Sequence, residues 1–207
     1  MIEVEAIAGT PNWHAARRGL LTASRIADAL AVLKNGKPSE SRRKLMVELL
    51  AERVSGYIVD HYVTPAMQWG IDNQPHAIAA YEAETGELVG PEVFVLHPEI
   101  DWAGATPDGT IGSDGLLEIK CPTTPTHLTW LLAGEVPEQH RLQMTFQLAC
   151  TRRQWVDFVS YDPRIKGDAQ LFIRRFEPSR DEIERVEAGA RQFLAELEAM
   201  SIQLRAA

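Results

Sequence analysis

Residues 106–122 contain three side chains whose types and spacing could do chemistry, namely Asp108, Glu118 and Lys120. Only the apolar Ile119 separates Glu118 from Lys120. Side chains alternate faces along a strand, so the two would project from one face while Ile119 points to the other. The Gly- and Asp-rich stretch between Asp108 and Glu118 favours a hairpin. Such a hairpin would bring two carboxylates and an amine together.

Two carboxylates and an amine at one point have a chemical logic. Paired carboxylate oxygens suit Mg²⁺, which keeps several water ligands. A bound Mg²⁺ acidifies one of these waters and stabilises charge on a phosphodiester oxygen, and a neighbouring lysine can orient the attacking water. The chain shows the signature of the PD-(D/E)XK nucleases, which here is Pro-Asp, then nine residues, then Glu, one residue and Lys. A surface hairpin with solvated charges is the alternative, because short patterns also occur by chance.

The composition is that of an ordinary globular protein. The 207 residues are enough for one domain with its own core, and 45% are hydrophobic while 24% are charged. No apolar run approaches the roughly 18 residues of a membrane span, and the N-terminus lacks the features of a signal peptide. The two cysteines, Cys121 and Cys150, show no metal-ligand spacing. We therefore expect a single domain over residues 1–207, no membrane association and a cytoplasmic location.

The net charge of −8 counts mildly against nucleic acid as the partner, because DNA-binding proteins are usually basic. A basic groove can nevertheless coexist with an acidic outer surface.

Periodicity and turn residues predict an α/β or α+β fold, with a mixed central β-sheet flanked by helices. Ser179 and Glu182 form the pattern of a capping box at the start of the last helix. The expected helices are one after Thr22 with Ile26, Leu30 and Leu33 inward, then 40–54, 74–84, one ending near 133, 137–150, and one from 179 onward. The expected strands are 93–96, 102–106, 116–120, 155–161 and 171–176.

Several blocks of the chain resemble the YqaJ-type viral recombinases, the phage lambda exonuclease family within the PD-(D/E)XK superfamily. The resemblance spans about residues 13–163, and its blocks occur in the family's order. They are WHAARRGLLTAS, WGIDNQPHAIAAYEAETG, ATPDG, LLEIKCP, LQMTFQLACTRRQW and SYDPR.

The resemblance implies a restriction-endonuclease-like core and a metal-dependent exonuclease. Such enzymes digest one strand of linear double-stranded DNA from a 5′-phosphorylated end, in the 5′→3′ direction. The 3′ single-stranded tail then serves recombination by a single-strand annealing protein. The family also implies a homo-oligomeric, trimeric ring, Mg²⁺ that Mn²⁺ can replace, and a phage or prophage origin within a bacterial host cell.

Carried over by position, the resemblance makes Asp108 and Glu118 the Mg²⁺ ligands, with the Ile119 backbone carbonyl as a third. Lys120 resembles the lysine that positions the attacking water. Gln143 matches a glutamine near the catalytic centre.

Arg17 and Ser24 match the pocket that grips the 5′-phosphate, with Arg18 as an adjacent competitor for the arginine role. Arginine suits phosphate through bidentate hydrogen bonds, and a serine near a helix N-terminus suits an anion. Trp13 is expected to anchor the core and could also stack on a base at a DNA end.

One position departs from the family. A glutamate that serves as a further metal ligand usually follows Trp-Gly, and Gln74 stands there in this chain. An amide oxygen can bind Mg²⁺ but carries no charge, so a second metal ion is in question. Asp72 would point elsewhere on a regular helix. Two other readings therefore stay open, an endonuclease and a DNA-end-binding protein with a degenerate site.

Overall fold

The computed structural model describes residues 2–4, 10–58 and 63–206. Its strands form two mixed sheets, so the predicted mixed sheet is present and divided in two. The four-stranded sheet has the order β1 (Ile2–Val4), β4 (Phe94–Leu96), β5 (Ala103–Ala105) and β2 (Leu21–Thr22). The five-stranded sheet has the order β3 (Val89–Gly90), β6 (Gly109–Ile111), β7 (Gly115–Lys120), β8 (Trp155–Tyr161) and β9 (Leu171–Phe176).

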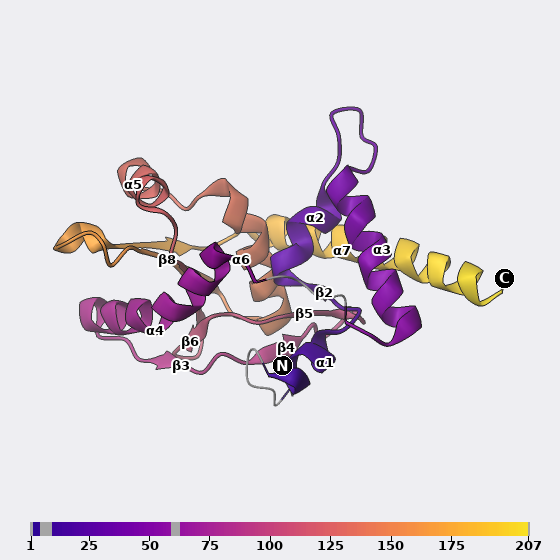
Figure 1. The fold of residues 1–207 in the computed structure, drawn as a ribbon, viewed down its shortest axis with the longest axis horizontal. Coiled ribbons are helices and arrows are strands. Elements are labelled where there is room, and N and C mark those ends of the chain that lie inside the picture. The colour runs from indigo at the N-terminus through magenta and orange to yellow at the C-terminus, as the bar shows by residue number, and fades with distance from the viewer. Residues whose placement is uncertain (1, 5–9, 59–62, 207) are drawn as a thin grey trace.

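Helices cover both faces of the five-stranded sheet. In Figure 1, α4 (Pro65–Thr85) lies below strand β8 and α5 (Thr124–Ala133) lies above it. Residues of α4 form one apolar cluster with Leu117, Ile119 and Val159. On the opposite face, Leu116 and Phe158 pack with α5 and α6 (Glu138–Thr151).

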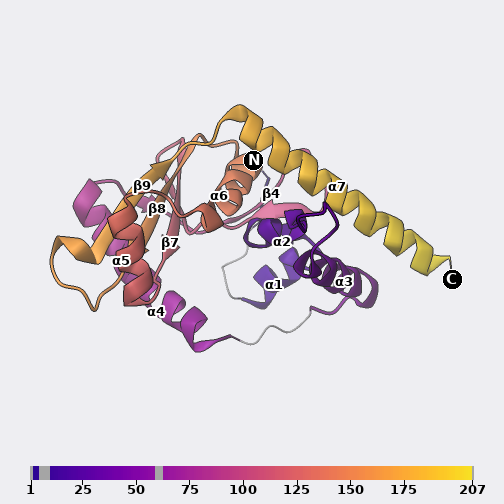
Figure 2. The ribbon, with the colours of Figure 1, turned by 90° about the horizontal axis from the view of Figure 1, so that it is seen from above.

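A second core joins the four-stranded sheet to the remaining helices. It contains residues of α2 (Ile26–Leu30), α3 (Glu40–Ser55), α6 and α7 (Arg180–Arg205) around β2 and β5. Figure 2 shows α7 running along one side of the molecule, with its C-terminal end projecting beyond α3. The predicted capping box is formed at its start, since Ser179 and Glu182 bond reciprocally. The other elements are α1 (Pro11–Arg17), η1 (Ala23–Arg25) and η2 (Asp168–Gln170).

The structure corrects the first predicted helix. Thr22 precedes the short 3₁₀ turn η1 and makes no side-chain capping bond, and α2 ends at Leu30. Leu33 is 46% exposed, not inward. The chain turns here because the Leu33 carbonyl accepts a hydrogen bond from Gly36, whose φ of +77° favours glycine.

The helix predicted over 74–84 starts earlier than expected. It begins at Pro65, and the Thr64 side chain caps it by accepting a hydrogen bond from the Met67 amide at 3.2 Å. Trp69 therefore lies inside α4 and not before it.

Helix α4 is tied to the sheet by a buried polar network. The Tyr81 hydroxyl donates to Asp157 Oδ2 at 2.8 Å, and Arg175 donates to both oxygens of the same carboxylate at 2.9 and 3.0 Å. Tyr81 is fully buried and Asp157 is 4% exposed. Burial, reinforced by the Asp157 carboxylate, raises the pKa of the Tyr81 hydroxyl well above its ordinary value.

We expect Tyr81→Phe to lower the free energy of unfolding by about 1–2 kcal/mol, because Asp157 loses a buried hydrogen-bond donor. Urea unfolding would measure the change. The control is Tyr57→Phe, since Tyr57 is 79% exposed. Equal stability of the two variants would contradict this account of how α4 is held.

Candidate active site

The hairpin of β6 and β7 brings Asp108 beside β7, as the sequence predicts. The Asp108 amide donates to the Leu117 carbonyl at 3.1 Å. Asp108 Oδ2 in turn accepts a hydrogen bond from the Ile119 amide at 2.6 Å. Both the backbone and the side chain of Asp108 are thereby fixed against β7.

Glu118 lies at the centre of a hydrogen-bond cluster and is only 1% exposed. Its Oε1 accepts hydrogen bonds from Lys120 Nζ and from Gln143 Nε2, the latter at 2.6 Å. Its Oε2 accepts from Gln147 Nε2 at 2.6 Å. Glu118 and Lys120 thus share one face of β7 while Ile119 joins the core on the other face, as strand alternation predicts.

Gln147 is a site residue that the sequence analysis missed. It is fully buried and lies four residues after Gln143 on α6, so both amides reach the same carboxylate. That helical spacing was the available signal. Gln147 Oε1 has no hydrogen-bond partner in the described part of the chain.

Burial and the close approach of like charges both shape the electrostatics of the site. Burial, together with the charge of Glu118, raises the pKa of Asp108 to about 8. Burial alone would lower the pKa of Lys120, but Glu118 and Asp108 raise it above its ordinary value. Two carboxylates held this close in a poorly solvated place are stabilised by a cation, so the donor set fits a divalent metal ion.

The residues that could hold such an ion are Asp108 and Glu118, with the predicted Ile119 carbonyl. Within residues 2–4, 10–58 and 63–206, no three His, Cys, Asp or Glu side chains gather closely enough to ligate one metal ion. Gln74 is not among the residues that line the space around these two carboxylates. Asp72 is exposed and accepts a hydrogen bond from Gln68 at 2.7 Å, consistent with its expected direction away from the site.

The predicted phosphate-binding residues line the same pocket as the carboxylates. This pocket has a volume of about 210 Å³. Trp13, Arg17 and Ser24 line it together with Asp108, Glu118, Lys120 and Gln143. The structure thus gathers all the sequence-predicted site side chains except Gln74 around one space.

Arg17 presents a guanidinium without a full set of partners. It stacks on the Trp13 ring at 3.7 Å, and its buried Nε has no hydrogen-bond partner among the described residues. Burial lowers the pKa of Arg17 to about 10, although Glu92 opposes this shift. Arg18 is exposed and donates to the Gly56 carbonyl at 2.7 Å, away from the pocket. Arg17 is therefore the arginine of this pocket.

Ser24 is exposed and lies in η1, not in a long helix. Its hydroxyl is 3.2 Å from that of Thr22, which also lines the pocket. Any anion binding by Ser24 would therefore depend on its hydroxyl and on Arg17 beside it.

Comparison with known proteins agrees with this geometry. Residues 12–154 match the YqaJ-like viral recombinase domain. The chain belongs to this family. It is an enzyme of the nuclease class. The YqaJ-like chain is 43% identical to the alkaline exonuclease LHK-Exo of Laribacter hongkongensis, whose structure it matches with a TM-score of 0.87 over 95% of this chain and 96% of that one.

A second LHK-Exo structure, in complex with dAMP, matches with the same identity, TM-score and coverage. A phage-related exonuclease from Haemophilus somnus 129PT shares the fold at 14% identity, with a TM-score of 0.61 over 87% of this chain and 96% of that one. A comparison with curated proteins gives no match. No helix of the described residues is long and apolar enough to cross a bilayer.

His140 lies close to the site on α6 and should make stability depend on pH. It stacks on Phe158, and burial, together with the charge of Lys120, lowers its pKa from 6.5 to about 4. The unfolded chain therefore binds more protons between these values, and the free energy of unfolding falls as the pH decreases through this range.

We expect the metal-free protein to lose about 1–2 kcal/mol of stability through His140 between pH 7 and pH 5. Urea unfolding of wild type and His140→Gln at both pH values, in chelator, would measure this difference. His76→Gln is the control, because His76 is exposed. Identical pH dependence in wild type and H140Q would disprove the contribution of His140.

Proposed function

We propose that this YqaJ-like chain is a Mg²⁺-dependent 5′→3′ exonuclease acting on linear double-stranded DNA. It would degrade one strand from a 5′-phosphorylated end and leave a 3′ tail for strand annealing. The observation that carries the proposal is the single pocket shared by Arg17 and by Asp108, Glu118 and Lys120. A phosphate-binding group and a hydrolytic group in one space suit an enzyme that starts at a DNA end.

In this proposal Asp108, Glu118 and the Ile119 carbonyl hold Mg²⁺, which Mn²⁺ can replace. The bound ion would acidify a water ligand and stabilise charge on the scissile phosphate. Lys120 holds and orients the attacking water from its place beside Glu118. Gln143 and Gln147 fix the Glu118 carboxylate, so that its oxygens stay where the cation is bound.

Arg17 and Ser24 would bind the terminal 5′-phosphate. The Trp13 ring packs against one face of the Arg17 guanidinium. This contact fixes the orientation of the guanidinium, whose Nε has no hydrogen-bond partner among the described residues. Arginine binds phosphate through charge-assisted hydrogen bonds. The LHK-Exo structure with dAMP, a nucleotide that carries one phosphate, supports the same ligand class for this pocket.

The wider assignment rests on family membership. We propose that residues 1–207 act as one nuclease domain and assemble into a trimeric ring. A ring would let an acidic chain handle DNA, because only the channel needs to be basic. The partners would be linear duplex DNA and a single-strand annealing protein, in the cytoplasm of a bacterial host, with a phage or prophage origin. Both cysteines are free, as in a reducing compartment.

Digestion of linear duplex DNA with a 5′-phosphate at one end and a 5′-hydroxyl at the other tests the proposal. We expect Mg²⁺-dependent loss of the strand that carries the 5′-phosphate, no reaction in chelator, and an intact closed circle. Lys120→Ala is the inactive control, expected to bind DNA ends without cutting them. Cleavage of the circle would favour the endonuclease, and end binding without cleavage by wild type would favour the degenerate site.

Arg17→Ala should lower the preference for phosphorylated ends. Loss of a charge-assisted hydrogen bond of about 1.5–3 kcal/mol corresponds to about a tenfold or larger fall in the ratio of initial rates on 5′-phosphate and 5′-hydroxyl ends. Arg18→Ala removes the same charge one residue away and should leave this ratio unchanged. Similar ratios in R17A and wild type would place the phosphate-binding group elsewhere.

A further inference from the structure

We propose that Glu92 supplies the third carboxylate of the metal centre in place of Gln74, acting on the cation through its water ligands. This inference rests on the proposed function, because it assigns a further residue to the same metal-dependent site.

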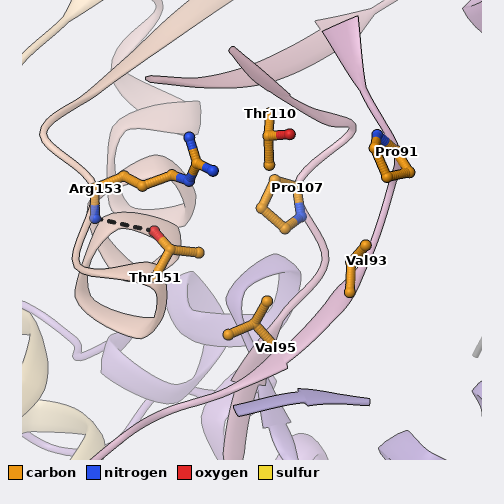
Figure 3. A pocket seen from close by; sticks show the side chains of 7 residues that line it. All are labelled: Pro91, Val93, Val95, Pro107, Thr110, Thr151 and Arg153. Carbon is orange, nitrogen blue, oxygen red and sulfur yellow. Dashed lines mark hydrogen bonds between the residues drawn. The ribbon is translucent and has the colours of Figure 1, made fainter. Parts of the chain in front are cut away.

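The path of the chain directs Glu92 into the active-site pocket. Its neighbours Pro91 and Val93 line a different, mainly apolar pocket of about 200 Å³ (Figure 3). Pro107 lines that second pocket too, and the following residue, Asp108, lines the active-site pocket. Side chains alternate along extended chain, so two neighbouring segments send apolar residues to one side and a carboxylate to the other. The remaining residues of the apolar pocket are Val95, Thr110, Thr151 and Arg153.

Both segments are crossings between the two sheets. Residues 91–93 connect β3 of the five-stranded sheet to β4 of the four-stranded sheet. Residues 106–108 return from β5 to β6. The active-site pocket therefore has a carboxylate on each crossing, and Glu118 on β7 is the third.

The surroundings of Glu92 favour a nearby cation. Burial raises the pKa of Glu92, the Arg17 charge lowers it and the Glu118 charge raises it. Three carboxylates and two cationic side chains share the pocket, and this excess of negative charge attracts a cation.

The separation of these groups favours contact through water. No three acidic side chains of the described residues are close enough to ligate one ion together. Mg²⁺ usually keeps several waters, and a carboxylate can accept hydrogen bonds from them. Glu92 can thus add charge to the site without entering the first coordination sphere.

The test measures Mn²⁺ binding in the absence of DNA, with electron paramagnetic resonance to quantify the free ion. We expect Glu92→Gln to raise the Kd for Mn²⁺ about tenfold, as typical for carboxylates that bond to metal ligands. Glu87→Gln is the matched control, because Glu87 is exposed and lies outside the pocket, and it should bind Mn²⁺ as wild type does.

An E92Q Kd within about twofold of wild type would overturn the assignment of Glu92. If E92Q does not fold, Glu92→Asp keeps the charge and should hold the Kd near that of wild type, and a tenfold weakening there would overturn the role of charge at a distance.

The two proposals fail in distinguishable ways. If wild type neither binds Mn²⁺ nor degrades linear DNA, the exonuclease proposal falls and the role of Glu92 falls with it. If wild type does both and E92Q matches it in Kd, only the role of Glu92 falls.

Discussion

Burying a carboxylate costs free energy unless hydrogen bonds or a cation replace the water that it has lost, and Glu118, which is 1% exposed, accepts hydrogen bonds from two amides of α6. Gln143 and Gln147 therefore hold the helix and the strand together while they orient the site. The hydrogen bond from the Ile119 amide fixes Asp108 against β7, where it lines the same pocket as Glu118. The repulsion between Asp108 and Glu118 is built into the fold, and it makes the site selective for a cation.

The division of the strands into two sheets creates the pocket around this pair. A continuous sheet would carry residues 91–93 and 106–108 as ladder residues with paired backbones. Instead the chain crosses between sheets at both places, and each crossing turns one side chain toward β7. The apolar pocket of Figure 3 is the reverse side of the same crossings. Its prolines limit the conformations of these segments, which helps to hold the carboxylates in place.

Local pattern was enough to predict the hairpin and the directions of Glu118, Ile119 and Lys120, because strand alternation and turn chemistry act over a few residues. Helical spacing could also have identified Gln147. Glu92 was beyond such reasoning, since its direction depends on a crossing between sheets whose strands pair over long separations in the sequence. The early start of α4 was missed for another reason. Thr64 and Pro65 are ordinary start signals, and the helix continues through Gly70 and Pro75, residue types that usually interrupt a helix.

The amide at residue 74 bears on how family resemblance should be used. Carrying site residues over from the family by position identifies the element that should supply a metal ligand. At residue 74 of this chain, that position holds an amide. The affinity of a site for a metal ion, however, depends on the charge nearby and on the hydrogen bonds made to the ion's water ligands. The segment of the chain that supplies these groups does not matter. Glu92 lines the same pocket as Asp108 and Glu118, so the departure from the family pattern does not by itself indicate a lost activity. Whether chemistry has been lost is decided by the residues that face the pocket, and these include Glu92.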